Sequence, residues 1–296
     1  MIPIKYILEN DVLEIEVASI DDYRGSRFDR TGFITQVRLK DGNHTFCTQE
    51  SMHSGQGTGG IGICSEFGIV TPLGYDSAEV GECFPKLGVG LLTKSDREPY
   101  DFSRPYSVLP FDVHVETGCD VITFHTESKE CQGFEASVNK RISMDGNRLT
   151  IAYELLNTGN KPIRTEEYSH NFMRIDGHDY GPDYTLTFSF PIKVENMEQV
   201  YTPQVLQVSS NEIRFNEVPQ HDVYLNPSVP VENSEIYWEL IHEPSRVGVR
   251  ETCNFPVGKL AVWGTAHVVS PEVFAVIDLN PGESQVWQRT FDFFIR

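Results

Sequence analysis

One histidine of this chain lies where a side chain could transfer protons. His170 belongs to the segment Glu-Glu-Tyr-Ser-His-Asn-Phe at 166–172, which comes after an apolar run at 149–157 and a turn at 158–162. An imidazole changes its protonation near neutral pH, and histidine is the most frequent general acid or base. A single histidine in a β-rich chain more often has a structural role, so the other motifs must decide between the two interpretations.

Three arginines near the N-terminus form a second candidate for chemistry. Arg24, Arg27 and Arg30 lie close together and make a local positive spot in an otherwise acidic chain. The planar guanidinium group suits paired hydrogen bonds to neighbouring hydroxyls or to a carboxylate. We expect Arg27 to contact a ligand, and we expect Arg24 and Arg30 to pair with nearby aspartates.

Several common motifs are excluded. The glycine-rich segment at 55–60, Gly-Gln-Gly-Thr-Gly-Gly, formally matches a dinucleotide-binding loop, but no strand precedes it and no helical period follows it. We therefore expect an irregular, flexible loop there. Walker, HExxH and GxSxG motifs are absent. The six cysteines show no metal-binding spacing, so we expect reduced, mostly buried thiols.

The composition restricts the class of partner. The 296 residues carry a formal net charge of −19 with a pI near 4.8, and such a surface repels phosphate backbones and anionic lipids. We expect neither a nucleic-acid nor a membrane partner. No apolar run approaches the roughly 20 residues of a membrane helix, and acidic residues follow the first six positions, so we expect a cytoplasmic protein. The assembly state is left open, with a homodimer as one option.

The elements that position these residues are predicted to be strands. Apolar and polar residues alternate with a period of two in many short runs separated by turn residues, which is typical of antiparallel sheets. No linker divides the chain and no repeat is found. We predict an all-β fold, a large antiparallel β-sandwich, as one domain over residues 1–296. The runs are 12–17, 33–40, 113–116, 121–126, 141–144, 149–153, 184–190, 236–240, 248–252, 260–263, 273–277 and 285–291.

Taken in chain order, the motifs resemble the aldose 1-epimerase (galactose mutarotase-like) superfamily. The resemblance covers the first hairpin at 32–42, Phe-Pro-x-x-Gly at 84–88, and the strand, turn and strand that carry His170. It continues with the tryptophan strand at 261–265 and a Pro-Gly-Glu turn at 281–283. The motifs are short, but they extend over the whole chain. The fold that the resemblance implies is the galactose mutarotase-like supersandwich.

The resemblance also implies roles for an acid and a base. The histidine that matches His170 protonates the ring oxygen of a sugar in the superfamily, so His170 is implied to act there as a cation. A glutamate at the end of a late strand takes the proton of the anomeric hydroxyl. Glu272 matches this glutamate in order and spacing, although it could also be an exposed residue in a turn after proline. Asp278 is a rival for the same role. The reaction requires no metal and no organic cofactor.

Further residues are implied to bind the substrate, a small carbohydrate. Phe84 and Lys86 match a wall of the sugar cleft, although an ordinary turn with a solvated lysine explains them equally well. Arg27 is also expected to contact the ligand. We expect His170, Glu272 and Arg27 to line one concave pocket. Aromatic side chains give sugars an apolar surface to stack on, and the candidates besides Phe84 are Tyr168, Phe172 and Trp263.

One departure from the superfamily bears on activity. A second histidine of the cleft is expected between the first third of the chain and the catalytic histidine, but residues 86–110 contain none. Two alternatives to an epimerase therefore stay open. The first is a carbohydrate-binding or sensing protein of the same fold without turnover, and the second is a lyase-type β-sandwich enzyme that acts on acidic sugars.

Overall fold

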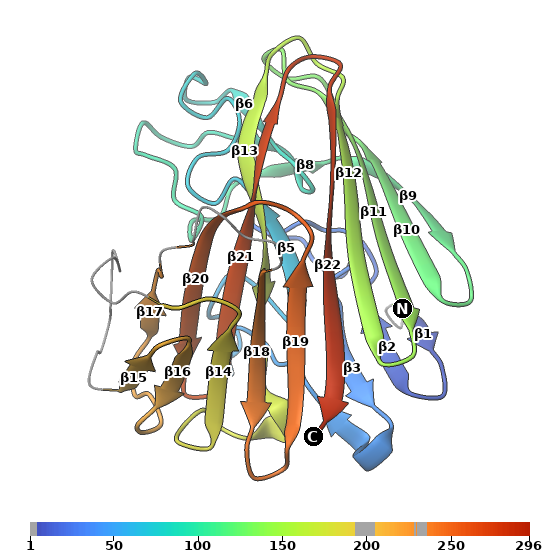
Figure 1. Ribbon diagram of the computed structural model, residues 1–296. Helices are drawn as coiled ribbons and strands as arrows, with labels where there is room; N and C mark the ends of the chain where they lie inside the picture. Colours follow the sequence, from blue (N-terminus) through green and yellow to red (C-terminus); the bar gives the residue numbers. More distant parts are fainter. Residues whose placement is uncertain (1–4, 193–204, 228, 230–235) are drawn as a thin grey trace.

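The computed structural model describes residues 5–192, 205–227, 229 and 236–296. In this described part, antiparallel strands form a nine-stranded sheet, a ten-stranded sheet and a small three-stranded sheet. Figure 1 shows the ten-stranded sheet in front and the small sheet at the top, beside the upper end of β13. The only helical segments among the described residues are two short 3-10 turns, η1 (Asp41–Asn43) and η2 (Ile175–Gly177).

The nine-stranded sheet contains strands from both halves of the chain. Its order is β1-β2-β3-β5-β13-β21-β20-β17, and β4 pairs with β3 beside this path. Near its middle, β13 (Ile163–Asn171) lies between β5 (Ile63–Phe67) and β21 (Val268–Leu279). The other strands are β1 (Tyr6–Glu9), β2 (Leu13–Val17), β3 (Ile34–Leu39), β4 (His44–Thr45), β17 (Val223–Leu225) and β20 (Val257–Thr265).

The ten-stranded sheet has the order β15-β16-β14-β18-β19-β22-β12-β11-β10-β9. Its long strand β22 (Ser284–Ile295) lies between β19 (Val247–Cys253) and β12 (Arg148–Asn157). The other strands are β9 (Asp112–Thr117), β10 (Val121–Glu127), β11 (Ala136–Asp145), β14 (Tyr184–Phe188), β15 (Leu206–Ser209), β16 (Glu212–Phe215) and β18 (Ile236–His242). The small sheet consists of β6 (Cys83–Lys86), β7 (Gly90–Thr93) and β8 (Val108–Pro110).

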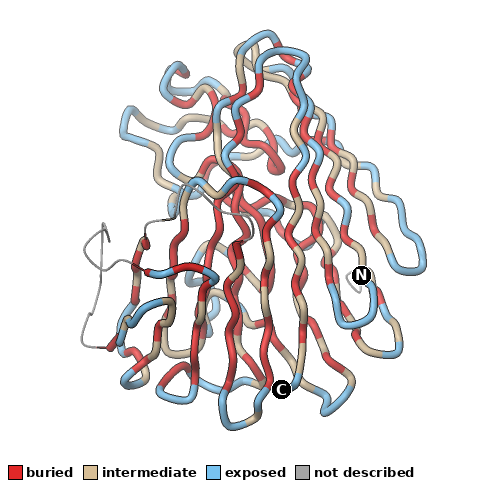
Figure 2. The backbone as a smooth tube through the Cα atoms, viewed as in Figure 1, coloured by how far each residue is buried: buried red, intermediate tan, exposed pale blue. Residues whose placement is uncertain are grey.

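The two large sheets pack face to face because their strands alternate apolar and polar side chains. In β2 the apolar residues of Leu-Glu-Ile-Glu-Val are buried while both glutamates stay partly exposed, and this alternation of buried and exposed positions is visible along most strands (Figure 2). Rings from opposite sheets meet in the core. The centroids of Phe46 and Phe293 lie 4.7 Å apart, and those of Phe67 and Trp287 lie 6.2 Å apart. The main apolar core therefore lies between the sheets.

A charged network also crosses this core. Arg289 of β22 is fully buried, and its Nη1 donates to Glu167 Oε2 on β13 at 2.6 Å. Its Nε lies 3.2 Å from Glu251 Oε1 on β19. The indoles of Trp287 and Trp238 each donate a hydrogen bond to one of these glutamates. Buried charges are tolerated when they are paired in this way, so the network holds β13 against the ten-stranded sheet.

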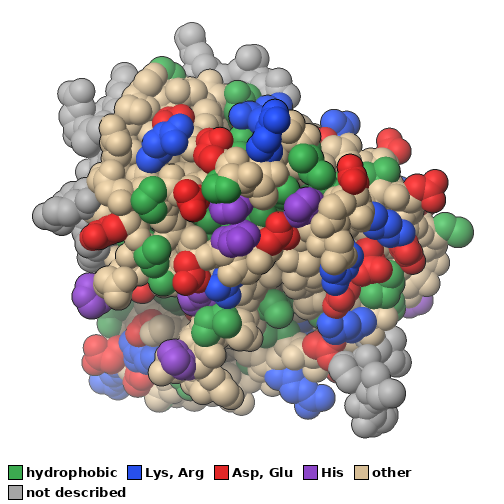
Figure 3. All heavy atoms as spheres, turned by 90° about the horizontal axis from the view of Figure 1, so that it is seen from below, with side chains coloured by type: hydrophobic (Ala, Val, Ile, Leu, Met, Phe, Trp, Pro, Cys, Tyr) green, Lys and Arg blue, Asp and Glu red, His purple; other side chains and the backbone are tan. Residues whose placement is uncertain are grey.

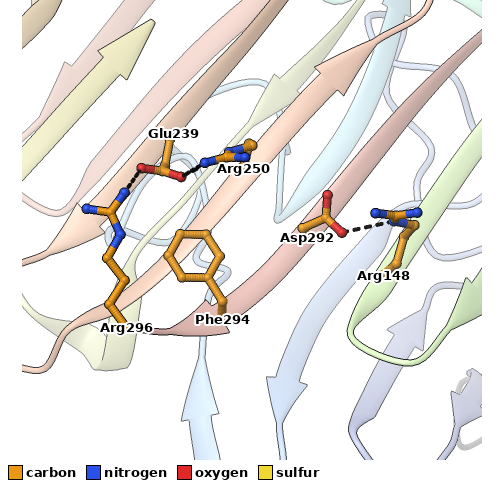
Figure 4. Close-up of a pocket in the computed structure, with 6 residues that line it drawn as sticks. All are labelled: Arg148, Glu239, Arg250, Asp292, Phe294 and Arg296. Carbon is orange, nitrogen blue, oxygen red and sulfur yellow. Dashed lines mark hydrogen bonds and ion pairs between the residues drawn. The ribbon is translucent and has the colours of Figure 1, made fainter. Parts of the chain in front are cut away.

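The outer face of the ten-stranded sheet carries a row of alternating charges. The strand register places Glu239, Arg250, Asp292 and Arg148 next to one another across four strands. Arg250 donates to Glu239 at 2.6 Å and Arg148 to Asp292 at 2.9 Å, as Figure 4 shows. A hollow of about 340 Å³ lies over this row. Because each acid is paired with an arginine, we interpret the row as cross-strand stabilisation of the sheet.

The prediction of an all-β antiparallel sandwich is confirmed. Each predicted run lies in a strand or overlaps one, and many bounds differ by only one or two residues, as for 121–126 in β10 and 248–252 in β19. The main core contains residues from Leu8 to Phe293. That the chain forms a single domain stays a prediction. No helix in the described part of the chain is long and apolar enough to cross a membrane.

Candidate active site

The candidate site lies on three neighbouring strands, on the face of the nine-stranded sheet that points away from the main core. In β13 and β5, His170 is opposite Cys64. In β13 and β21, Tyr168 is opposite Phe274, and Met173 bridges Val269. This register places His170 directly opposite Glu272. Strand pairing therefore brings together two residues that are about a hundred positions apart in the sequence.

His170 and Glu272 are in direct contact. The Nε2 atom of His170 lies 3.3 Å from Oε1 of Glu272, and both side chains are only 6% exposed. Glu272 lies inside β21, so the alternative of an exposed glutamate in a turn after proline is wrong. The rival Asp278 lies further along β21, 63% exposed, and pairs with Arg164. The structure thus brings Glu272, and not Asp278, to the histidine.

A serine connects the two groups on their other side. Ser270 Oγ lies 2.8 Å from His170 Nδ1 and 3.1 Å from Glu272 Oε1, and it accepts a hydrogen bond from the backbone N–H of Asn171 at 2.9 Å. Ser270 is fully buried. His170, Glu272 and Ser270 therefore form a closed set of contacts through Nε2 and Nδ1 of His170, Oγ of Ser270 and Oε1 of Glu272.

The environment makes both ionisable groups unfavourable as ions. Burial lowers the pKa of His170 well below its usual value of 6.5, and the positive charge of Arg27 lowers it further. Burial also raises the pKa of Glu272 from 4.5 to about 7, although Arg27 and the hydrogen bond from Ser270 oppose this rise. Near neutral pH His170 is therefore uncharged. The pKa of Glu272 lies close to neutral pH, so this carboxyl group can both gain and lose a proton there.

Arg27 lies beside this pair in a dense hydrogen-bond network. Its Nε donates to Glu66 Oε2 at 2.9 Å, its Nη1 to Thr58 Oγ1 at 3.0 Å, and its Nη2 to the hydroxyl of Tyr168 at 3.0 Å. The side chain is 6% exposed, and its guanidinium carbon lies 4.2 Å from the ring centroid of Phe102. Arg27 therefore fixes several elements around the site, and its contact with a ligand stays a prediction.

Lys86 contacts the other carboxylate oxygen of Glu66 and is fully buried. Its Nζ donates to Glu66 Oε1 at 2.8 Å, to the hydroxyl of Tyr100 at 2.9 Å and to the carbonyl oxygen of Gly68 at 3.3 Å. These contacts occupy the three hydrogens of the ammonium group. Burial lowers the pKa of Lys86, and it opposes the ionisation of Glu66 as well, but Lys86 and Arg27 together still lower the pKa of Glu66 below 4.5.

The aromatic candidates differ in their exposure. Phe172 stacks on His170 with the ring centroids 3.9 Å apart, and Trp263 meets the same imidazole edge to face at 5.5 Å. Phe84, Tyr168 and Phe172 are fully buried, whereas Trp263 is partly exposed. Phe84 packs in a small cluster with Tyr75 and Tyr106. Phe84 has no exposed face, and Lys86 has no unused hydrogen-bond donor. This arrangement therefore does not support the prediction that either residue contacts a sugar directly.

The core side of β13 holds the site in place. Asn171 follows His170 and points to the opposite face of the sheet, where its Nδ2 donates to Glu251 Oε2 at 2.9 Å and to the carbonyl oxygen of Pro271 at 2.7 Å. Glu251 belongs to the charged network of the core. The position of His170 is therefore fixed from both faces of the sheet.

Several residues around the site were not predicted from the sequence. Glu66 and Ser270 are the most important, followed by Thr58 and Glu50 of the glycine-rich region, where Glu50 accepts from Thr58. A signal for Glu66 was available, because a glutamate in the short apolar run Ile-Cys-Ser-Glu-Phe must find a charged partner. The loop at 55–60 is irregular as predicted, and through Thr58 it is part of the site.

One expectation about charged groups is wrong. Arg24 and Arg30 donate to backbone carbonyl oxygens, those of Asp21 and Ile20 respectively, and not to aspartate side chains as expected. Within the described residues, no three His, Cys, Asp or Glu side chains gather into a metal-binding group. The arrangement of His170, Glu272 and Ser270 is suited to proton transfer.

Comparisons with known proteins identify the fold. No protein-family model and no curated protein sequence matches the chain. Among solved structures, a galactose mutarotase related enzyme from Lactobacillus acidophilus matches with a TM-score of 0.64 at 13% identity, covering 98% of this chain and 97% of that one. A galactose mutarotase-like protein from Lactobacillus casei gives 0.62 at 14% identity, with 98% and 100% covered.

A third match, an aldose epimerase homologue from C. elegans, has a TM-score of 0.59 at 11% identity and covers 99% of this chain and 100% of that one. Identities this low show a shared fold and leave the activity open. The match extends over the whole length of each chain, as the order of the sequence motifs does. The chain therefore has the galactose mutarotase-like fold.

Proposed function

We propose that this protein is an aldose 1-epimerase-like enzyme that interconverts the α and β anomers of a sugar by opening and closing its ring. His170 is the acid at the ring oxygen, and Glu272 is the base at the anomeric hydroxyl. The observation that carries the proposal is the contact of 3.3 Å between Nε2 of His170 and Oε1 of Glu272. Both sugar oxygens are bonded to the same carbon, so an acid and a base that serve them together must be neighbours.

The titration behaviour of the pair supports the same reaction. A general base is most effective when its pKa is near the working pH, and burial raises the pKa of Glu272 to about 7. An ordinary surface glutamate would be a much weaker base. The uncharged state of His170 changes the mechanism that the sequence suggests, because a histidinium ion is not the resting form of the acid.

Binding of the sugar is assigned to the partly exposed groups near the pair. Trp263 lies next to His170 and keeps part of its ring accessible, so it is the aromatic surface on which a sugar would stack. Phe102 lies over Arg27 and is 37% exposed. Arg27 holds Glu66 and Tyr168 in position, and Lys86 holds Glu66 through its other carboxylate oxygen.

The test is anomer exchange followed by NMR across a panel of free and phosphorylated aldoses. The wild-type protein should accelerate exchange of at least one sugar. On that sugar, His170→Asn and Glu272→Gln should each lower kcat by roughly 10²-fold or more, the usual scale for loss of one general acid or base. The double variant should lose less than the product of the two effects, because the groups act as a unit.

His242→Asn is the matched control. His242 is also buried, but it lies on β18 of the ten-stranded sheet, where its Nδ1 contacts Ser245 Oγ at 2.8 Å. This variant should retain wild-type exchange. Wild-type rates in His170→Asn would remove the histidine from the mechanism. Binding of a saccharide without faster exchange would instead identify a binding protein, and absorbance of an unsaturated uronate would identify a lyase.

A further inference from the structure

An uncharged histidine cannot act as an acid without help. If His170 gave its Nε2 proton to a ring oxygen and received nothing, it would become an imidazolate, which is far too basic to form in a buried site. A second proton must therefore reach Nδ1 while the first one leaves Nε2. The neighbours of Nδ1 decide where this proton comes from, and the atom in contact with Nδ1 is Ser270 Oγ at 2.8 Å.

The hydrogen bonds of Ser270 allow two arrangements. A hydroxyl has one hydrogen and two acceptor positions, and the N–H of Asn171 occupies one acceptor position at 2.9 Å. The hydroxyl hydrogen can point to His170 Nδ1, or it can point to Glu272 Oε1 at 3.1 Å while Oγ accepts from Nδ1–H. The two arrangements differ in the direction of the hydroxyl hydrogen and in which nitrogen of His170 carries its hydrogen.

Resting on the proposed function, we propose that Ser270 relays a proton between Glu272 and His170, so that the histidine changes its tautomer and not its charge during each ring opening. The geometry that carries the proposal is the chain of contacts from Glu272 Oε1 through Ser270 Oγ to His170 Nδ1. The relay makes the acid and the base two ends of one path. It also assigns a function to a serine that is fully buried beside them.

The transfers balance as follows. Glu272 as a carboxylate takes the proton of the anomeric hydroxyl, the bond between the anomeric carbon and the ring oxygen breaks, and the carbonyl of the open sugar forms. His170 Nε2–H gives its proton to the ring oxygen. Ser270 Oγ–H gives its proton to Nδ1, and the proton that Glu272 gained moves to Oγ.

After these transfers Glu272 is again a carboxylate, Ser270 is again a hydroxyl, and His170 is neutral with its hydrogen on Nδ1. The net transfer is therefore one proton from the anomeric oxygen to the ring oxygen, with no net change of charge on the protein. Closure on the other face of the carbonyl reverses each step and restores the hydrogen on Nε2. No oxidant, reductant or other reactant is needed.

A purely structural role for Ser270 predicts different results. In that case the hydroxyl only orients His170 and satisfies the N–H of Asn171, and a single proton moves at each end of the reaction. The two roles differ in the number of exchangeable protons that move in the rate-limiting step. This number is measured as the dependence of kcat on the deuterium fraction of the solvent, on a sugar that the wild-type protein turns over.

For the wild-type protein the relay predicts a curved dependence, because at least two exchangeable protons move in the same step. Ser270→Ala should lower kcat by roughly tenfold to a hundredfold, the scale of a lost proton-transfer group, with a smaller change in KM. Its dependence on deuterium should become linear, and its activity should move to lower pH, where His170 can act as a cation. Ser270→Thr, which keeps a hydroxyl, should restore the curved dependence.

Ser65→Ala is the control for the loss of a buried hydroxyl. Ser65 is 2% exposed and lies on β5, opposite Ser169 and away from His170, so kcat and the curvature should stay at wild-type values. A linear dependence in the wild-type protein overturns the relay even if every Ser270 variant fails to fold. Wild-type kcat and curvature in Ser270→Ala would overturn it as well. Both results are compatible with the proposed epimerase function. Absence of exchange with every sugar would instead overturn the proposed function and the relay together.

Discussion

At the scale of single residues, the site depends on charges that are buried and mutually compensated. Glu66 is fully buried and receives Arg27 on one carboxylate oxygen and Lys86 on the other, at 2.9 and 2.8 Å. Tyr168 donates to the same carboxylate at 2.7 Å. Glu50 adds a second carboxylate, whose Oε1 lies 3.6 Å from Nη1 of Arg27. The positive charge of Arg27 helps to keep His170 unprotonated.

The residue-scale prediction concerns this anion. Glu66→Gln removes the charge but keeps the size, so it leaves Arg27 and Lys86 buried without their partner. Breaking a buried ion pair from one side typically costs about 3–5 kcal/mol, and we expect a loss of this order in the free energy of unfolding, measured with urea. Asp278→Asn breaks the exposed pair with Arg164 and should change stability by less than about 1 kcal/mol. Equal losses in the two variants would contradict the burial argument.

The sequence singles out His170 and Glu272, the proposed acid and base, but not the residues around them. His170 and Glu272 stand in recognisable motifs, whereas Ser270 lies in an apolar run with nothing to distinguish it. Its contact with Nδ1 depends on the register of β13 against β21, which a single sequence does not specify. The network of Arg27 was missed for the same reason, because its partners Thr58, Glu66 and Tyr168 lie 31, 39 and 141 positions away in the chain.

At the scale of elements, the position of β5 depends on a glycine. Gly62 precedes β5 and has a φ of +60°, its N–H donates to Thr48, and its carbonyl oxygen accepts from Phe172. A Cβ atom at this position would overlap the carbonyl oxygen of Ile34 on β3. Glycine is required here because the backbones of β3 and β5 approach each other closely.

Gly62→Ala should therefore destabilise the protein strongly. The left-handed conformation alone costs an alanine roughly 1–2 kcal/mol, and the overlap with Ile34 adds to this, so we expect a total loss of at least about 3 kcal/mol, which exceeds most single substitutions. Gly81→Ala is the matched control, since Gly81 has a φ of +92° with open space around its Cβ position. Similar losses for both variants, in urea unfolding, would show that the close approach of β3 and β5 has no cost.

Strands were easier to predict than their partners. The period of two in 12–17 or 121–126 follows from half-buried strands, and the structure places both runs in strands. The late strand β21 extends from Val268 to Leu279, although the sequence predicts only 273–277. Pro271 interrupts the pattern there, and the first residues of β21 are buried on both faces, so no alternation marks them.

At the scale of the whole molecule, the chain is acidic, but the pH dependence of its stability depends on a few groups with shifted pKa values. Acidic and basic side chains are interspersed on the lower end of the molecule (Figure 3), and the formal net charge of −19 comes from 43 acidic and 24 basic residues. Groups with shifted pKa values determine the pH dependence of folding.

His170 and Glu272 act in opposite directions. The lowered pKa of His170 means that the unfolded chain binds more protons, so its stabilising contribution is present above about pH 6.5 and is lost as the pH falls below this value. The pKa of Glu272 is raised to about 7, so the folded chain binds more protons between the two pKa values. Its contribution is complete below the unfolded value and is lost as the pH rises through about 7.

Two variants separate these contributions, with the free energy of unfolding measured by urea from pH 4.5 to pH 8. Glu272→Gln cannot ionise, so its stability relative to wild type should rise with pH across this range by about 3 kcal/mol, since one pKa unit corresponds to about 1.4 kcal/mol. His170→Asn should show the opposite trend and gain relative stability as the pH falls below about 6.5. If the Glu272→Gln curve instead runs parallel to that of wild type, the carboxyl group titrates as in the unfolded chain, and the proposed base does not have a pKa near 7.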